Sequence, residues 1–186
     1  MKKNLLQMVL FVVLCTGAAL GEDLVKNAGF EQAGADGLPS DWHGAPNAYS
    51  RDTAEKHSGE AALKYVNADS GAYVLCAQPV ALTPGKMYEI SAWVKTQDIM
   101  GEESGATLCV EYSGANGKWI GGCYPQGVKG TTDWTLIKGD TGRIPPEAAH
   151  CTLSCYVRRE MTGTAWWDDV SITPIAERPL SSMLMV

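Results

Sequence analysis

The sequence predicts an all-β sandwich, and three observations carry that prediction. No stretch shows the 3.6-residue periodicity of a long amphipathic helix. The chain holds 20 glycines and 9 prolines, which punctuate strands with turns. Roughly nine or ten segments of strand character follow one another at short spacing, as in two-layered β-domains.

The first 21 residues have the parts of a secretory signal peptide. Two lysines precede an apolar run over residues 5–14, and Ala19 and Gly21 are small residues at the positions that a signal peptidase reads. The apolar run is too short for an ordinary transmembrane helix. We therefore expect cleavage after Gly21, an extracellular or periplasmic location, and no association with a membrane.

The mature chain is predicted to be one acidic domain. Removing residues 1–21 leaves 165 residues (186 − 21), enough for a buried core, and the loss of two lysines takes the formal net charge from −6 to −8. This acidity argues against nucleic acid, anionic lipid and sulfated polysaccharide as partners, but not against neutral sugars. Six Trp and seven Tyr stand against two Phe, and such rings suit both cores and wet binding surfaces.

The first half of the mature chain gives five predicted strands separated by turn residues. They cover Leu24–Glu31, Tyr49–Ala54, Ala61–Val66, Gly71–Leu82 and Met87–Thr96, and the first of them ends in a turn at Asn27–Gly29. Phe30 is expected in the core. Pro79 marks the strand Gly71–Leu82 as an edge strand or as a strand with a β-bulge. A Thr-Pro-Gly-Lys turn precedes the fifth strand, whose alternation places Tyr88, Ile90, Ala92 and Val94 inward and Glu89, Ser91, Trp93 and Lys95 outward.

The second half of the mature chain gives five more predicted strands. They cover Thr107–Tyr112, Lys118–Tyr124, Trp134–Gly139, His150–Arg158 and Gly163–Ile172. An Asn-Gly pair in the loop Ser113–Gly117 predicts a hairpin between the first two of these. Alternation in His150–Arg158 places Cys151, Leu153, Cys155 and Val157 inward and Thr152, Ser154, Tyr156 and Arg158 outward. Tyr124, Trp134 and Trp166 are expected in the core.

The closing strand raises a question of charge. Val170 and Ile172 mark one face as buried, and strict alternation puts Trp166 and Asp168 on that face. A buried carboxylate must be paired, hydrogen-bonded or bound to a metal.

We assign residues 22–174, which include the closing strand, to the sandwich. We assign residues 175–186 to a linker or to the start of a further segment of a longer protein.

Five cysteines follow the cleavage site, an odd number that leaves at least one without a partner in the chain. Cys151 and Cys155 lie four residues apart on one strand, about 13 Å, too far to bridge. We interpret both as buried free thiols. Cys109 points outward but flanks a hairpin with Cys123, so these two can face each other. The chain has no CxxC pair, which argues against a zinc site.

Six local patterns occur in a fixed order over Leu24–Thr173. They are NAGFE, LPSDW, HSGEAAL, LTPGKMYEISAWVK, DWTLIKG and GTAWWDDVSI. Their order and spacing resemble the carbohydrate-binding modules of families 4 and 9, with family 22 close by. The resemblance implies a jelly-roll β-sandwich of two antiparallel sheets, without catalytic activity, that targets an attached enzyme to a polysaccharide such as a β-glucan or xylan. A catalytic domain C-terminal to this segment is an expected partner.

The resemblance also implies a structural calcium ion that ties the first strand to the last. The corresponding positions here are the carbonyls of Gly29 and Gly59 and the carboxylates of Glu31 and Asp168. An oxygen-only set of carboxylates and carbonyls suits this hard cation. The alternative is a metal-free Asp168 that accepts hydrogen bonds from backbone amides.

In the family, sugar binds across a concave sheet, where outward rings stack on pyranose faces and polar side chains read the hydroxyls. The resemblance and the outward alternation together give seven candidates here: Trp93, Tyr156, Arg158, Trp119, Glu111, Tyr73 and Gln78. Trp93 is the leading candidate, because an exposed Trp needs a reason. Tyr156 and Arg158 equally fit an ordinary solvated face, and Glu111 can instead pair with Arg158.

Two other functions stay open. One is a structural or adhesion sandwich that binds no sugar, because a fold does not fix a function. The other is a jelly-roll lyase or glycosidase, but a glycosidase needs two carboxylates across a cleft. Asp168 and Asp169 are adjacent and point to opposite faces of a strand. The three histidines have no evident nucleophile beside them, so the sequence favours a protein that is not an enzyme.

Overall fold

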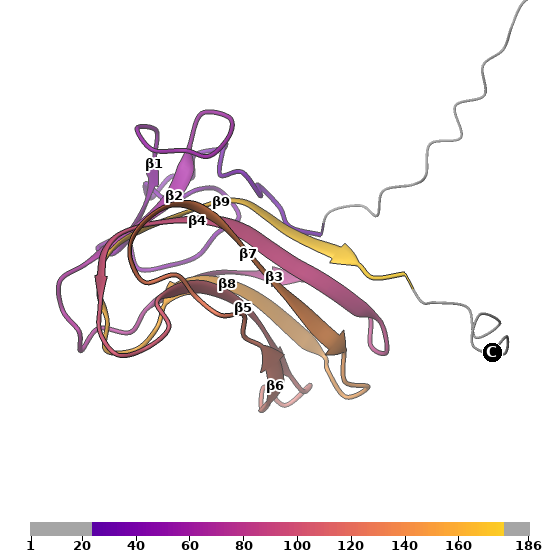
Figure 1. Cartoon of the computed structure of the whole chain (residues 1–186). Coiled ribbons are helices and arrows are strands. Elements are labelled where there is room, and N and C mark those ends of the chain that lie inside the picture. Colours follow the sequence, from indigo (N-terminus) through magenta and orange to yellow (C-terminus); the bar gives the residue numbers. More distant parts are fainter. Residues whose placement is uncertain (1–23, 177–186) are drawn as a thin grey trace, which may run out of the picture.

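The computed structural model describes residues 24–176 and shows two stacked antiparallel sheets (Figure 1). The predicted signal peptide over residues 1–21 and all but two residues of the predicted linker over 175–186 lie outside the described residues. Within residues 24–176, no helix is long and apolar enough to cross a membrane.

Nine strands make up the described part of the chain. They are β1 (Tyr49–Asp52), β2 (Ala62–Asn67), β3 (Leu75–Val80), β4 (Met87–Met100), β5 (Ala106–Ser113), β6 (Trp119–Cys123), β7 (Gly130–Arg143), β8 (His150–Val157) and β9 (Thr162–Pro174). One sheet has five strands in the order β1-β2-β9-β4-β7, and the other has four in the order β3-β8-β5-β6. Figure 1 shows β4 and β7 arching over β8 and β5. The predicted all-β sandwich of two antiparallel sheets is confirmed.

The core lies between the sheets and is filled by the alternation that the sequence predicts. In β4 the inward residues are Tyr88, Ile90, Ala92 and Val94, and in β8 they are Cys151, Leu153, Cys155 and Val157. Phe30 and Trp42 are also buried, with ring centroids 5.1 Å apart. Because large side chains interdigitate here, the outward positions of the same strands are fixed as well.

The predicted turn at Asn27–Gly29 is confirmed, but the strand predicted to lead into it does not form, because residues 26–29 all lie in the turn. Asn27 and Phe30 have φ values of 46° and 58°, which an extended strand cannot contain. The Asn27 side chain accepts a hydrogen bond from the Gln32 amide (3.0 Å) and donates one to the Gln32 carbonyl (2.9 Å). Such local amide bonds favour a turn over a ladder. The segment still lies beside β9, because the Val170 amide donates to the Ala28 carbonyl (3.0 Å).

In the closing strand, the predicted inward direction is correct for Val170 and Ile172 but wrong for Trp166 and Asp168. A β-bulge is the reason. Between the pairs Ser91–Ser171 and Trp93–Asp168, two steps on β4 face three steps on β9. Asp169 takes up the extra residue with φ of 47°. The bulge reverses the alternation, so Trp167 is in the core beside Val170, whereas Trp166 and Asp168 lie on the outer face of the five-stranded sheet.

Other differences concern strand length and cysteine pairing. β4 and β7 run longer than predicted and β3 shorter, and β3 is an edge strand as Pro79 indicated. Cys123 is the register partner of Val110, so Cys109 and Cys123 do not face each other across the hairpin. The cross-strand cysteine pair is Cys76–Cys155. All five cysteines of the described region are free thiols.

Candidate functional site

The outer face of the four-stranded sheet gathers most of the predicted ligand residues. Aromatic rings and guanidinium groups follow one another across its strands. We call this set the aromatic row and define it as Trp119, Tyr124, Arg158, Tyr156, Tyr73 and Arg159. Three of its rings keep a large exposed fraction: 58% for Trp119, 41% for Tyr73 and 40% for Tyr124. Exposed rings that are contiguous on one face indicate a binding surface rather than scattered surface residues.

One end of the row is a hydrogen-bonded group on β5 and β6. The Tyr124 hydroxyl donates to Glu111 Oε1 (2.7 Å), and the Trp119 indole nitrogen donates to the Tyr124 hydroxyl (3.3 Å). Burial and then the Glu111 bond raise the pKa of Tyr124 to about 12. A Cβ on Gly122 would lie 2.8 Å from the Tyr124 hydroxyl oxygen, so this glycine lets the ring fold back over the sheet. The prediction that Tyr124 is a core residue is therefore wrong.

The other end of the row is an alternation of rings and cations. Arg158 Cζ lies 5.8 Å from the Tyr124 ring centroid and 5.5 Å from that of Tyr156. Tyr156 meets Tyr73 edge to face at 6.1 Å, and Arg159 Cζ lies 5.1 Å from the Tyr73 ring. These geometries are those of cation–π and T-shaped contacts. They hold the exposed rings in fixed positions, which lowers the entropic cost of binding.

Cys109 lies on this face beneath the row. It is buried, and burial raises the pKa of its thiol to about 12. The Tyr156 side chain lies close enough to influence the pKa of this thiol. Cys109 therefore acts as a small neutral packing residue under Tyr156.

Trp93 does not belong to the same surface as Tyr156, which corrects the expectation of one shared face. It lies on β4, in the other sheet, so the thickness of the sandwich separates the two side chains. The His57 imidazole stacks on Trp93 with centroids 4.0 Å apart and an interplanar angle of 15°. Trp134, which was predicted in the core, meets the same imidazole edge to face at 5.7 Å outside the core cluster. One flat face of Trp93 is therefore already covered.

Gln78 is also placed away from the aromatic row. Its side chain is 2% exposed, and both ends of its amide bond the Lys26 backbone at 3.0 Å. Gln78 thus serves as an anchor for the N-terminal segment. Of the seven predicted ligand residues, the structure brings together five: Tyr73, Glu111, Trp119, Tyr156 and Arg158.

Sequence reasoning missed two members of the row. Tyr124 has a signal in the Gly121-Gly122 pair, since glycines inside a strand mark a close approach. Arg159 follows the end of β8 in a turn, where alternation carries no information.

The four residues predicted to hold calcium do come together, on the outer face of the five-stranded sheet. Asp168 is fully buried there, and its Oδ2 accepts hydrogen bonds from the amides of His57 (2.8 Å) and Ser58 (3.0 Å). Glu31 accepts from the Glu60 amide with both oxygens, at 3.0 and 3.1 Å. Burial raises the pKa of Asp168, and the backbone hydrogen bonds oppose that rise.

Gly29 lies beside both carboxylates, and Gly59 lies beside that of Glu31. A Cβ on Gly29 would be 3.7 Å from Asp168 Oδ1 and 3.8 Å from Glu31 Oε1. A Cβ on Gly59 would overlap Glu31 Oε1, and Gly59 has φ of 56°. The donor set of two carboxylates and nearby carbonyls fits a hard cation. Within residues 24–176, no three His, Cys, Asp or Glu side chains are grouped to hold a metal, so such a site needs the backbone carbonyls.

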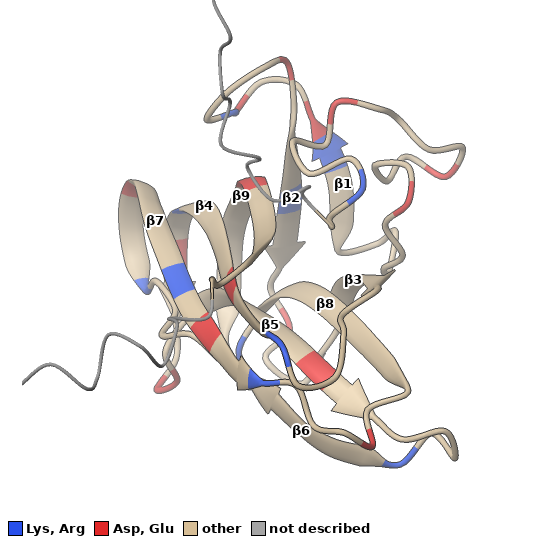
Figure 2. Ribbon diagram, turned by 90° about the vertical axis from the view of Figure 1, so that its right-hand side faces the viewer, with Lys and Arg blue, Asp and Glu red and all other residues tan. Residues whose placement is uncertain are grey.

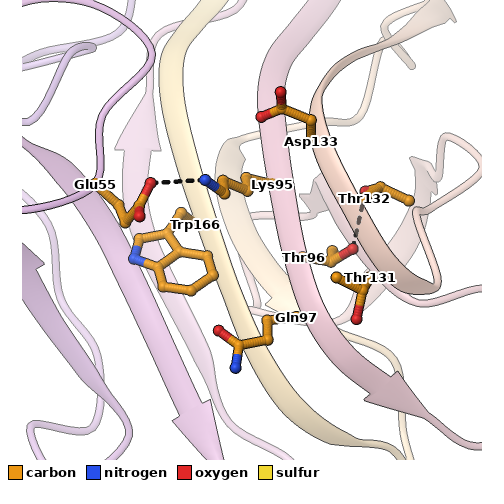
Figure 3. Close-up of a pocket in the computed structure, with 8 residues that line it drawn as sticks. All are labelled: Glu55, Lys95, Thr96, Gln97, Thr131, Thr132, Asp133 and Trp166. Atoms are coloured by element: carbon orange, nitrogen blue, oxygen red, sulfur yellow. Dashed lines mark hydrogen bonds and ion pairs between the residues drawn. The ribbon is translucent and has the colours of Figure 1, made fainter.

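A cavity of about 370 Å³ lies on the outer face of the five-stranded sheet (Figure 3). Its lining consists of Glu55, Lys95, Thr96, Gln97, Thr131, Thr132, Asp133 and Trp166. The Lys95 and Glu55 charges are paired at 2.7 Å, as Figure 3 shows. Trp166 is the only ring of this lining and is just 5% exposed, so it offers little flat surface to a ligand. The aromatic row is the stronger candidate for binding.

The arrangement around His57 does not form a nucleophilic site. His57 Nδ1 lies 2.7 Å from Asp169 Oδ2, but the Ser58 hydroxyl donates to Asp169 Oδ1 (2.7 Å) rather than to the imidazole. A serine nucleophile needs contact with its base. Figure 2 shows acidic and basic residues interspersed over the ribbons of both sheets.

Residues 22–154 match a family model described as "Carbohydrate binding domain", which covers families 4 and 9. No curated protein sequence matches the chain.

Solved structures share the fold at low sequence identity. The CBM22-1 xylan-binding domain of Xyn10C from Paenibacillus barcinonensis aligns with a TM-score of 0.59 and 15% identity, over 86% of this chain and 98% of that domain. The CBM22-1–GH10 modules of xylanase Xyn10B from Clostridium thermocellum, solved with xylohexaose, align at 0.61 and 20%, over 83% of this chain and 29% of that one. The Stig cyclase Fisc from Fischerella sp. TAU aligns at 0.59 and 14%, over 84% and 98%.

Proposed function

The chain belongs to the carbohydrate binding domain family, and from that membership we propose that it is a secreted, non-catalytic module that binds polysaccharide through the aromatic row. The single observation that carries the proposal is the set of exposed rings on the outer face of the four-stranded sheet: Trp119, Tyr124 and Tyr73.

The geometry suits an extended sugar chain. The row passes from β6 over β5 and β8 to the segment before β3, which is three inter-strand spacings of about 4.8 Å, or roughly 14 Å. Flat rings stack on the apolar faces of pyranose units, and the side chains of Glu111 and Arg158 can bond their hydroxyls. We propose a xylan-like or β-glucan-like backbone, and solved neighbours that are xylan-binding domains support the xylan-like one.

The absence of a catalytic arrangement among the described side chains supports a targeting role. Within residues 24–176, Asp168 lies beneath loops and Asp169 bonds His57 and Ser58, so this pair cannot flank a glycosidic bond. We propose that the module, released outside the cytoplasm, brings an attached glycan-degrading domain to its polysaccharide.

We also propose a structural calcium ion held by Glu31, Asp168 and the carbonyls of Gly29 and Gly59. The ion would link the N-terminal segment to β9 and offset the mutual repulsion of two close carboxylates. Adding calcium to chelated protein should then raise the melting temperature, since a ligand of the folded state stabilises it by mass action. An unchanged melting temperature at millimolar calcium contradicts this part of the proposal.

The binding proposal is tested by affinity electrophoresis in gels that contain xylan, mixed-linkage glucan or no polysaccharide. We expect retardation of the wild-type protein and its loss or reduction in Trp119→Ala, with affinity at least about fivefold weaker for a stacking ring at a binding surface. Trp93→Ala is the matched control, because it removes the same side chain from the opposite sheet.

Two results would overturn the proposal. One is the absence of retardation in every polysaccharide gel. The other is loss of binding in Trp93→Ala together with normal binding in Trp119→Ala, which would move the site to the five-stranded sheet.

A further inference from the structure

Arg158 forms no ion pair with a carboxylate of the described residues. Its guanidinium lies between the rings of Tyr124 and Tyr156, partly withdrawn from water. Its Nε is buried without a hydrogen-bond acceptor, and no other buried side-chain nitrogen or oxygen of the described residues is in that state. No ion pair joins Arg158 or Arg159 to a carboxylate within residues 24–176.

The nearby carboxylates form no ion pair with Arg158 or Arg159 among the described residues. Glu111, the residue expected to pair with Arg158, instead accepts the Tyr124 hydroxyl at 2.7 Å. Glu160 follows Arg159 directly in the chain, yet it forms no ion pair among the described residues. A protein with a formal net charge of −6 thus presents two arginines without an ion pair on this surface.

A partly buried guanidinium without an ion pair is costly. A partly buried cation loses hydration, and cation–π contacts return only part of that loss. A bound neutral sugar would leave the charge uncompensated and would remove more water from it. A bound carboxylate would match it, because the planar guanidinium presents parallel N–H donors to two oxygens.

We propose that the aromatic row selects a saccharide bearing an isolated carboxylate, the chemistry of a uronic acid unit on an otherwise neutral chain. The proposal rests on the proposed function and names the ligand class for the same surface. The rings hold the neutral sugars, and Arg158, with Arg159 beside Tyr73, takes the carboxylate. The acidity of the whole protein opposes a polyanion, so the charge must be sparse along the chain.

Calorimetric titration of the full chain with two matched ligands tests this inference. One ligand is a xylo-oligosaccharide with a single glucuronic acid branch, and the other is the same compound with its carboxyl group reduced to an alcohol. We expect the acid to bind at least about tenfold more tightly, as for a charge-assisted bidentate contact. The preference should shrink between 20 mM and 500 mM salt, where the Debye length falls from roughly 20 Å to 4 Å.

The outcomes separate the two proposals. Equal affinity for the acid and the reduced ligand overturns the further inference and leaves the proposed function standing. Binding of neither ligand counts against both.

Variants assign the preference to the named arginines. Arg158→Gln should bring the affinity ratio of acid to reduced ligand close to one, and Arg159→Gln should lower it. Lys138→Gln, on β7 of the other sheet, removes the same charge from the protein and should keep the wild-type ratio. Where Arg158→Gln does not fold by circular dichroism, Arg158→Lys takes its place and should lower the ratio severalfold, because Lys lacks the bidentate fork. An undiminished ratio in the Arg158 variant overturns the inference.

Discussion

Replacing Asp168 with alanine should destabilise the protein even without calcium. The carboxylate is fully buried and accepts three backbone N–H groups, from His57 (2.8 Å), Ser58 (3.0 Å) and Asp169 (2.8 Å). Each donor left without its acceptor costs about 1 kcal/mol or more, so Asp168→Ala should lower the free energy of unfolding by about 3 kcal/mol. For a domain of this size, that corresponds to a fall in melting temperature of roughly 6–12 °C.

The assay is urea unfolding followed by tryptophan fluorescence, with EDTA present so that hydrogen bonding alone is measured. Asp133→Ala is the matched control, because Asp133 is exposed and its side chain accepts a single amide, that of Trp134 (2.8 Å). We expect the control to change the free energy of unfolding by less than about 1 kcal/mol. An equal effect in the two variants would refute the reasoning. With calcium in place of EDTA, the gap between wild type and Asp168→Ala should widen.

Two further predictions concern Tyr124 and the strand that carries it. Gly122→Ala should lower stability by about 1–3 kcal/mol and weaken glycan binding, because its Cβ would lie 2.7 Å from the Val110 carbonyl oxygen and displace the Tyr124 ring; urea unfolding and calorimetry check this, and an unchanged affinity contradicts it. Since the folded-state pKa of Tyr124, about 12, exceeds the ordinary value, its contribution to stability is complete below about pH 10 and is lost as pH rises through 12. Ultraviolet titration of wild type against Tyr124→Phe should therefore show the missing phenol near pH 12, and a difference near pH 10 would contradict the assignment.

The regular strands made much of the aromatic row predictable. Alternation in β8 correctly separates Cys155 in the core from Tyr156 on the outer face. The register of β8 with β5 then brings Tyr156 beside Thr107 and Cys109 beside Ser154. In a strand without a bulge, a period of two is reliable where one face is buried, because a slip would expose the core residues.

Alternation does not reveal which sheet a strand joins. Trp93 and Tyr156 both point outward from regular strands, yet β4 and β8 belong to different sheets. The expected single surface therefore divides into two. Sheet membership depends on long-range pairing, which a local pattern does not contain.

The β-bulge in β9 breaks the two-residue alternation of side chains on which the prediction relied. Alternation applied backward from Val170 predicts that Trp166 and Asp168 lie in the core. Asp169, with φ of 47°, is the extra residue of the bulge, so the residues before it lie on the faces opposite to those predicted. Asp tolerates this left-handed conformation better than most residues, and two adjacent Asp gave no sign of which one adopts it. The resemblance nevertheless named residues that lie close to one another, with Gly29 beside both Asp168 and Glu31, because homologous positions are independent of local strand parity.

The central claim, that saccharide binds on the outer face of the four-stranded sheet, is tested most directly by NMR of the tryptophan indoles. The chain has six tryptophans, and each contributes one indole N–H resonance. Trp119 reports on the aromatic row, whereas Trp93 and Trp134 report on the opposite sheet. On titration with a xylo-oligosaccharide, the account predicts a saturable shift of the Trp119 resonance and unmoved resonances for Trp93 and Trp134. A shift of Trp93 or Trp134 with Trp119 unmoved would contradict it.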